Sequence, residues 1–420
     1  MRRMAANSMP GAPAPGHATE PAADRPLRVD LLTREYPPDV YGGAGVHVEY
    51  LAENLRTLAD VRVHCFGAPG PRAQPGVTGY ATPPGLQGAN PALRTMGIDL
   101  EMVAGAAGTG IAHSHTWYAN LAGHVAKLLY GVPHVVTTHS LEPLRPWKAE
   151  QLGGGYALSS WCERTALEAA DSVIAVSDGM RRDLLDCYPA VDPGRVHVVH
   201  NGIDTDQYAP DPGTGVLERL GVDPDRPCVT YVGRVTRQKG LPYLLRAADR
   251  LPAGAQLVLL AGAPDTPEIA AEVEGLVARL RERRDGVVWV RQMLPKREVI
   301  QVLSHSTVFA CPSIYEPMGI VNLEAMACET AVVATATGGI PEVVADRETG
   351  LLVATEQAPD GTPRDEEGFV AGLAAAITEL LEDPELAARM GRAGRDRATR
   401  QFSWESIAER TMRVYRQALG

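Results

Sequence analysis

Two glutamates beside a predicted helix start make the most informative stretch of the chain, which reads PSIYEPMGI and continues to Glu324. A strand, VFACPS, ends there, and a helix should begin near Gly319, where free N–H groups and the positive dipole end suit a phosphate. Glu316 lies just before this helix and Glu324 a little over two turns along it, so both carboxylates can face one cleft and accept from ligand hydroxyls. The alternatives are a helix-stabilising charge for Glu316 and an exposed polar position for Glu324.

A second chemical feature is the run YVGRVTRQKG, in which a predicted strand ends in glycine and two cations follow. Arg234 and Lys239 flank a turn that leads into a helix at Gly240. A guanidinium fork and a lysine point charge suit a diphosphate that gains negative charge as it leaves. The competing interpretation is a solvated basic turn.

The first predicted strand, Leu27–Thr33, runs into a glycine-rich loop, YGGAG, and a helix follows. Gly42 and Gly43 would let the backbone approach a ligand closely, and the helix start offers N–H groups to an anion. The loop lacks the GxGxxG spacing of a dinucleotide site. A tight strand-to-helix turn without a ligand is the alternative.

Histidines follow two further strands, in HSHTWY and in TTHS. His139 follows directly after the apolar run of its strand, at a position where an apolar core residue would cost less free energy to bury. Two histidine-bearing strand ends indicate a cleft. A metal is not predicted, because no third ligand stands at metal-site spacing. We expect hydrogen bonds to ligand hydroxyls instead.

The elements that position these residues form two series of short strands alternating with amphipathic helices. The first series runs from Leu27 to Val199 and the second from Cys228 to Val353, with a segment rich in Asp, Pro and Gly between them. This alternation predicts an α/β protein with two doubly wound parallel sheets, in which ligands bind at the carboxyl ends of the strands. The predicted divisions are a tail at 1–26, a first domain at 27–207, a second at 208–402 and a C-terminal helix at 403–420.

Composition narrows the function classes. The chain has 420 residues and a formal net charge of -11, which argues against a nucleic-acid binder. Its six cysteines form no CxxC pair, as expected of reduced thiols in a cytoplasmic protein. The tail lacks the apolar run of a signal peptide, and no membrane span or membrane face is predicted. The oligomeric state, including a homo-oligomer, stays open.

Together these motifs resemble the GT-B retaining glycosyltransferases of family 4. The resemblance covers about Arg28 to Arg416 and rests on YGGAGVH, HSHTWY, TTH, HNGID, GRVTRQKG and above all YEPMGIVNLEAMA. It implies two facing Rossmann-like domains, with a C-terminal helix that crosses back to the first, and a metal-independent reaction without a cofactor. TREYPPDVYGGAGVHV and HSHTWYANLAGH resemble the actinobacterial branch described as glycogen synthase or α-maltose-1-phosphate synthase.

The resemblance also implies roles for single residues. Arg234 and Lys239 would bind the donor diphosphate and support its departure. Other donor contacts would be made by the sugar-binding Glu316, the ribose-binding Glu324 and the backbone of Met318, Gly319 and Ile320. The base pocket would include Gln292 and Met293. In the first domain, Gly42 and Gly43 would approach the donor, and His139 would contact the sugar near its 6-hydroxyl.

The branch implies glucosyl transfer from ADP-glucose, with retention, into an α-1,4 bond in α-glucan metabolism. UDP or GDP as the nucleotide stays open. The chain departs from polymer-extending synthases, whose KTGGL becomes VYGGA and whose HxHDWH becomes HSHTWY. Glucose 1-phosphate is therefore favoured as acceptor over a growing glucan. A nucleotide-sugar epimerase, a non-catalytic sensor and an inositol- or lipid-directed transferase are the rivals.

A phosphorylated acceptor needs cations in the first domain. The segment Ser140–Tyr156 follows His139 directly and contains Arg145 and Lys148. Its Pro and Gly residues and its position at a strand end suit a binding loop. Tyr118 lies in the neighbouring motif and could stack on a glucose ring. A solvated loop and core aromatics are the alternatives.

Overall fold

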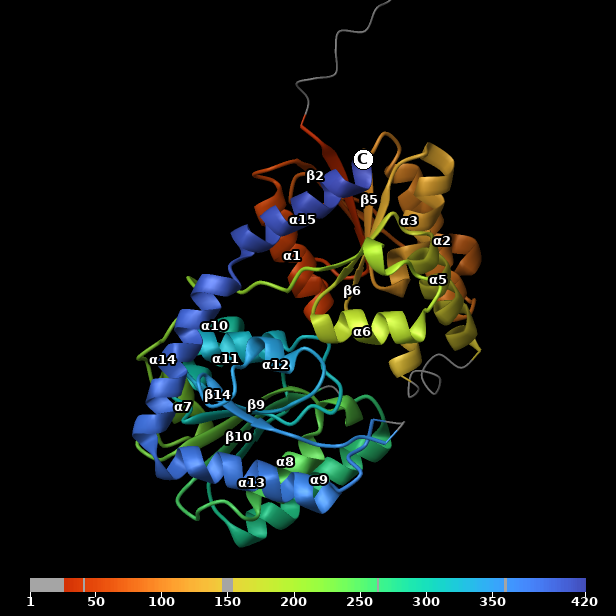
Figure 1. Ribbon diagram of the computed structural model, residues 1–420. Coiled ribbons are helices and arrows are strands. Elements are labelled where there is room, and N and C mark those ends of the chain that lie inside the picture. The colour runs from red at the N-terminus through yellow and green to blue at the C-terminus, as the bar shows by residue number, and fades with distance from the viewer. Residues whose placement is uncertain (1–25, 41, 146–153, 263, 359–360) are drawn as a thin grey trace, which may run out of the picture.

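The computed structural model describes residues 26–40, 42–145, 154–262, 264–358 and 361–420. They form two α/β lobes, one built from the first half of the chain and one from the second (Figure 1). The predicted tail at 1–26 lies, apart from its last residue, outside the described residues.

The first lobe is built on a sheet of order β3-β4-β2-β1-β5-β6-β7-β8. All of its pairings are parallel except that of the two short strands β3 and β4. The central strands are almost completely buried, as expected for a parallel sheet covered on both faces, and β5 and β6 carry buried histidines and hydroxyls beside their apolar residues. The strands are β1 (Arg28–Thr33), β2 (Asp60–Phe66), β3 (Gly70–Pro71), β4 (Val77–Tyr80), β5 (Ile111–His115), β6 (His134–Thr138), β7 (Ser172–Ala175) and β8 (Val196–Val198).

Helices cover both faces of this sheet. Successive residues of β1 point to opposite sides: Leu31 packs in the core under α1, and Leu32 packs in the core under α2 and α3. The helices of the lobe are α1 (Gly43–Leu55), α2 (Pro91–Gly105), α3 (Trp117–Tyr130), α5 (Gly155–Ala169) and α6 (Asp178–Cys187). Short 3-10 turns lie at Pro84–Leu86, Glu142–Leu144 and Pro193–Arg195.

The second lobe has an all-parallel sheet of order β11-β10-β9-β12-β13-β14. Its strands are β9 (Cys228–Arg234), β10 (Gln256–Gly262), β11 (Val287–Val290), β12 (Val308–Cys311), β13 (Ala331–Thr335) and β14 (Gly350–Val353). Its helices are α7 (Gly215–Leu220), α8 (Leu241–Ala248), α9 (Pro267–Arg283), α10 (Lys296–Ser304), α11 (Ile320–Ala327), α12 (Ile340–Val343), α13 (Glu366–Glu382) and α14 (Pro384–Gln401), with a 3-10 turn at Arg237–Lys239. Two doubly wound parallel sheets confirm the predicted fold class.

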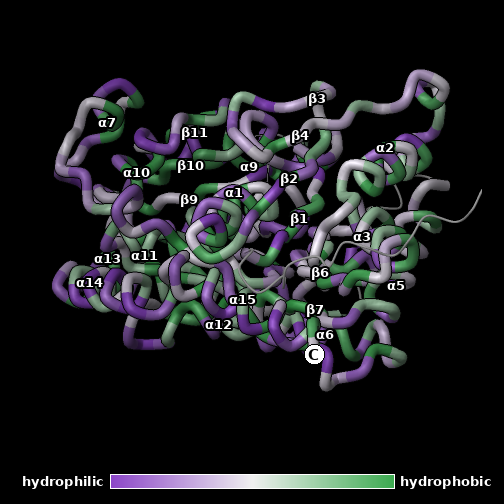
Figure 2. The backbone as a smooth tube through the Cα atoms, turned by 90° about the horizontal axis from the view of Figure 1, so that it is seen from above, coloured by the Kyte–Doolittle hydropathy of each residue, from purple (hydrophilic) through white to green (hydrophobic). Residues whose placement is uncertain are grey.

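The last helix, α15 (Trp404–Leu419), returns to the first lobe and lies beside α1 (Figure 1). It buries Trp404, Ile407, Met412 and Tyr415 in the core that also holds the apolar residues of β1 and α1. The crossing back of the C-terminal helix, implied by the family resemblance, is therefore observed. Hydrophilic residues recur along α15, as the purple stretches in Figure 2 show.

Local boundaries differ from the predictions in the first lobe. The apolar positions of the sequence predict a helix over Val46–Leu58, but α1 begins at Gly43, inside the glycine loop, and ends at Leu55, and Leu58 is 44% exposed. Sequence periodicity placed its start three residues too late, because glycines carry no apolar signal although their backbone can open a helix. The strands β3 and β4 and the helix α2 had not been predicted. All six cysteines are free, and five of them are buried.

Candidate active site

Several of the predicted site residues lie where each sheet reverses its strand order. In the first sheet this point lies between β1 and β5, which lead to the glycine loop and to His115. In the second it lies between β9 and β12, which lead to Arg234 and to Glu316. Open α/β sheets bind ligands in the crevice at these switch points.

The two lobes are in contact on the side where the switch points lie, so the switch points face each other. The Ser177 hydroxyl, just after β7, donates to the Pro317 carbonyl at 2.6 Å. Glu342 accepts from the backbone N–H of Asp178 at 2.8 Å and lies 2.9 Å from the His200 ring. One buried cluster holds residues of both lobes, such as Met180 and Met318. The sequence did not indicate that Ser177 and Glu342 join the two lobes. Of the residues in these contacts, His200 alone lay in a motif that had been recognised, HNGID.

Lys239 and Glu316 form the central ion pair of the second lobe. Lys239 Nζ lies 2.5 Å from Glu316 Oε2, to which the Ser313 hydroxyl also donates at 3.2 Å. Burial opposes a charge on Lys239, but the Glu316 carboxylate raises the pKa of the lysine above its ordinary value. The ammonium is therefore held charged at the cleft, where an anionic ligand could take it from the carboxylate.

A glycine brings these two groups together. Gly240 follows Lys239 with φ +65°, and a Cβ built on it would lie 1.9 Å from the Pro312 carbonyl oxygen. No other residue fits this approach between the turn after β9 and the loop after β12. The Thr236 hydroxyl caps the turn by accepting from the Lys239 N–H at 3.3 Å. The lysine is thus positioned by backbone geometry as well as by its ion pair.

Arg234 has a different environment from Lys239. Its guanidinium donates to Asp265 Oδ1 at 3.0 Å, and its side chain is 44% exposed. Its charge lies close enough to oppose that of Lys239. The two predicted cations thus flank one strand end, with the lysine inside and the arginine at the rim.

The helix start predicted near Gly319 is that of α11. Gly319 caps this helix in the left-handed region at φ +89°, and a Cβ there would lie 2.5 Å from Asn322 Nδ2. Met318 is buried, and its sulfur accepts from the Asn201 N–H at 2.9 Å. Ile320 begins the helix, and no acidic side chain lies in the first turn to compete for its N–H groups.

Glu324 lies on α11, in the same lobe as Glu316 but in a different environment. Its Oε1 accepts from the Tyr208 hydroxyl at 3.1 Å. Burial raises the pKa of Glu324 to about 7, against the opposing effects of Tyr208, Lys296 and Lys239. Near neutral pH this carboxyl can therefore switch between donating and accepting a hydrogen bond.

Gln292 and Met293 follow β11 on an exposed segment, where the Met293 side chain is 82% exposed. A methionine side chain that is so open to solvent is available for contact with a planar ligand. Their role in a base pocket stays a prediction.

The glycine loop of the first lobe reaches the second. Gly42 caps α1, and its N–H donates to Glu35 Oε2 at 2.8 Å. A Cβ built on Gly43 would lie 3.6 Å from Ile320 Cδ1, so the starts of α1 and α11 approach each other across the cleft. Two helix N-termini therefore face the same space, which favours an anionic ligand.

Three histidines meet beneath this loop. His115 ends β5, His139 follows β6, and His47 joins them from α1, so that one nitrogen of each lies within 4.8 Å of the others. Burial lowers the pKa of His47 to about 4 and lowers the pKa values of His115 and His139 well below the ordinary value, which keeps all three rings neutral at pH 7. The sequence shows no third ligand at metal-site spacing beside the strand-end histidines, because spacing along the chain does not show what an adjacent helix contributes.

The predicted acceptor residues lie on the first lobe. The Tyr118 ring lies 4.1 Å under the Arg34 guanidinium, and Arg145 Nη1 donates to the Ser140 hydroxyl at 3.0 Å. Lys148 lies outside the described residues. Arg145 Nε is buried without a hydrogen-bond partner, which leaves one donor of this guanidinium unused. The acceptor roles stay predictions.

Comparison with known proteins identifies this arrangement. The model described as Glycosyltransferase Family 4 matches residues 41–207, and that described as Glycosyl transferases group 1 matches residues 217–397. The α-maltose-1-phosphate synthase of Mycolicibacterium smegmatis is 58% identical over 93% of this chain and 99% of its own.

The chain belongs to glycosyltransferase family 4.

Solved structures of similar shape agree with this assignment. Sucrose-phosphate synthase from Thermosynechococcus elongatus has a TM-score of 0.74 at 27% identity, over 93% of this chain and 98% of the other. The catalytic domain of starch synthase IV from Arabidopsis thaliana, bound to ADP and acarbose, has a TM-score of 0.73 at 19% identity, over 94% and 99%. The family 4 enzyme is therefore a glycosyltransferase with the GT-B fold. Within its described residues, each helix is too short or too polar to cross a membrane.

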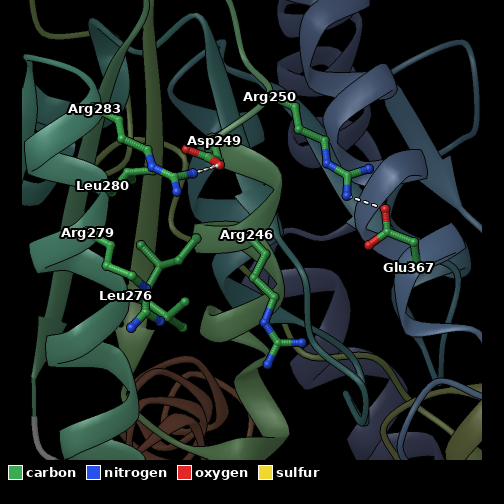
Figure 3. Close-up of a pocket in the computed structure, with 9 residues that line it drawn as sticks. Arg246, Asp249, Arg250, Leu276, Arg279, Leu280, Arg283 and Glu367 are labelled. Atoms are coloured by element: carbon green, nitrogen blue, oxygen red, sulfur yellow. Dashed lines mark hydrogen bonds and ion pairs between the residues drawn. The ribbon is translucent and has the colours of Figure 1, made fainter.

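The family 4 enzyme also has a hollow of about 300 Å³ away from the cleft, between α8, α9 and α13 (Figure 3). Three of its arginines pair with acids of neighbouring elements, among them Arg283 with Asp249 and Arg250 with Glu367. Exposed pairs of this kind contribute little to stability. The hollow contains none of the strand ends that carry the predicted donor residues, and we do not assign it to the active site.

Proposed function

We propose that this enzyme transfers the glucosyl group of ADP-glucose, with retention, to O4 of glucose 1-phosphate, and so forms maltose 1-phosphate. The observation that carries the proposal is the 58% identity to the α-maltose-1-phosphate synthase of M. smegmatis over nearly the full length of both chains. Identity at this level spans both lobes, and therefore both the donor and the acceptor sides of the cleft.

The donor side of the proposal rests on the second lobe. Lys239 is charged and lies beside Glu316, so a diphosphate could take the ammonium while the carboxylate turns to the sugar hydroxyls. Arg234 at the rim would add a second cation. ADP as the nucleotide agrees with the ligand named for the Arabidopsis starch synthase.

The reaction we propose is a front-face displacement. The bond between C1 of glucose and the diphosphate oxygen breaks, a bond from C1 to O4 of the acceptor forms on the same face, and the O4 proton passes to the departing phosphate. In this scheme Glu316 holds hydroxyls of the transferred glucose and does not act as a covalent nucleophile. Lys239, Arg234 and the α11 N-terminus would stabilise the leaving charge, so we expect no metal requirement.

The acceptor side rests on the first lobe. The phosphate of glucose 1-phosphate is a dianion. We assign Arg145, which follows β6 and has a buried Nε–H without a partner, to bind this phosphate. Tyr118 would stack on the sugar ring and His139 would contact the transferred glucose. An acceptor of neutral glucan would not use Arg145 in this way.

The test supplies ADP-glucose with either glucose 1-phosphate or glycogen and measures ADP release and product mass. Maltose 1-phosphate as the main product supports the proposal, and an α-linkage in its NMR spectrum supports retention. A higher kcat/KM for glycogen extension than for glucose 1-phosphate would contradict the proposal and favour the polymer-extending alternative. Turnover of ADP-glucose without an acceptor would favour an epimerase, and unchanged rates in EDTA would agree with a metal-free reaction.

A further inference from the structure

The cluster of His47, His115 and His139 offers more than sugar hydrogen bonds. His115 Nδ1 and His139 Nε2 are 3.1 Å apart, and the ring of His47 lies 4.8 Å from that of His139, centroid to centroid. Around a tetrahedral zinc with Zn–N distances of about 2.0–2.1 Å, two nitrogens stand roughly 3.3 Å apart. This pair is therefore close to ligand spacing, although its two nitrogens are hydrogen-bonded to each other and a metal would replace that hydrogen bond. The nitrogen of His47 needs to close by up to about 1.5 Å, from a largest separation of 4.8 Å.

Several ring nitrogens of the cluster are buried without a partner. Both nitrogens of His47 and Nε2 of His115 have no hydrogen bond, although the two residues are 2% and 0% exposed. The Asn201 side chain lies close enough to His47 to raise its pKa against the larger effect of burial, but the two side chains do not meet in hydrogen-bond geometry, and Asn201 Oδ1 is also left without a partner. Buried polar atoms in a folded protein normally find a partner, so this set indicates that a ligand belongs here.

Other histidines of the region behave differently. His113, two residues before His115, has both nitrogens engaged, with the Tyr415 hydroxyl and the Thr137 hydroxyl each at 2.7 Å. It is fixed as a structural residue, whereas in the cluster of three His115 Nδ1 is hydrogen-bonded to His139 Nε2, and both nitrogens of His47 and Nε2 of His115 have no partner. Neutral imidazole is a preferred ligand of zinc, and three imidazoles with an open fourth position form a known type of zinc site.

We propose that His47, His115 and His139 form a zinc site whose occupation blocks the active site. The ion enters from the cleft beside His139, which is the partly exposed member of the three. Water fills the fourth position. If His139 binds the transferred sugar, as the proposed function has it, a bound ion takes that side chain away from the donor. Zinc is then a reversible inhibitor of a reaction that itself needs no metal.

The first experiment measures binding without turnover, on the full-length, tag-free chain. Co²⁺ is titrated as the visible probe and Zn²⁺ as its competitor. We expect one Co²⁺ per chain, an absorption spectrum of four-coordinate cobalt with nitrogen ligands, and its loss on adding Zn²⁺. X-ray absorption on the zinc-loaded wild-type chain should count three imidazole ligands, a result that does not depend on any variant.

Variants locate the site. His47→Gln and His115→Gln should each weaken Co²⁺ binding by about 100-fold or more, since the loss of an outer-shell partner alone costs about 10- to 100-fold and these variants remove a ligand. His197→Gln, on β8 and outside the cluster, is the matched control and should bind as the wild type does. Thermal melts of each variant show that it is folded.

The outcomes separate this inference from the proposed function. Stoichiometric binding lost in both cluster variants supports the site, whichever acceptor the enzyme uses. Binding retained in both variants, fewer than three imidazoles by X-ray absorption, or no saturable binding would overturn it. Inhibition by Zn²⁺ that EDTA reverses and excess ADP-glucose relieves supports the inhibitory role. Zinc binding at full activity would overturn that role.

Discussion

Replacing Lys239 with methionine tests the central ion pair, because the change keeps an unbranched side chain of similar volume and removes its charge. The Lys239 and Glu316 side chains are 23% and 9% exposed, so the variant leaves a carboxylate that is almost wholly buried without its cation. Breaking a buried pair in this way costs about 3–5 kcal/mol. Because Lys239 keeps some contact with solvent, we expect about 3 kcal/mol of lost stability.

The double variant Lys239→Met with Glu316→Gln separates stability from catalysis. It removes the stranded charge while keeping the volume of both side chains, so we expect it to recover stability to within about 1 kcal/mol of the wild type. Activity should not return. Loss of the cation that faces the leaving diphosphate costs about 2–4 kcal/mol of transition-state stabilisation, or roughly 30- to 1000-fold in kcat.

The assay pairs thermal melts with initial rates from ADP-glucose and glucose 1-phosphate. Arg250→Met is the control, since it removes an exposed ion pair of the same lobe and should cost less than about 1 kcal/mol without changing the rate. A double variant as unstable as the single variant would refute the idea that the unpaired Glu316 carboxylate causes the loss of stability. A double variant with near-normal kcat would refute the role of Lys239 in catalysis.

Three further changes test other parts of the structure. The pKa of Glu324 is raised from 4.5 to about 7, so its contribution to stability is full below about pH 4.5 and is lost as pH rises through about 7. Because the side chain keeps partial exposure, we expect the free energy of unfolding to fall by about 2 kcal/mol over this range. Thermal melts across the range should show that Glu324→Gln abolishes this fall. Trp404→Ala should lower stability by about 3–5 kcal/mol, since Trp404 is buried and stacks on Tyr50, and an unchanged melting temperature would contradict the packing of α15 on the first lobe. Arg145→Ala with Lys148→Ala should raise the KM for glucose 1-phosphate and leave the KM for ADP-glucose alone, and an equal change in both would sink the acceptor assignment.

Local pattern in the sequence was enough to place most site residues at strand ends. The apolar run of β12 followed by Glu316 and Gly319 predicts a strand, a loop and a helix start, because burial and backbone freedom are properties of neighbouring residues. The same holds for Lys239 after β9 and for His139 after β6. Alternation of strands and helices likewise predicted two parallel sheets, and the motif resemblance supplied the family and the returning helix.

Which of these residues meet was decided by the tertiary structure. Lys239 and Glu316 are 77 positions apart and pair because β9 and β12 are neighbours in the sheet, an order that local periodicity does not encode. His47 joins His115 and His139 because α1 packs over the strand ends, and its helical pattern alone marks it as an ordinary buried position. Long-range contacts depend on sheet order and lobe closure, which are set by the packing of the whole chain, and so the charged pair and the histidine cluster became visible only in the folded protein.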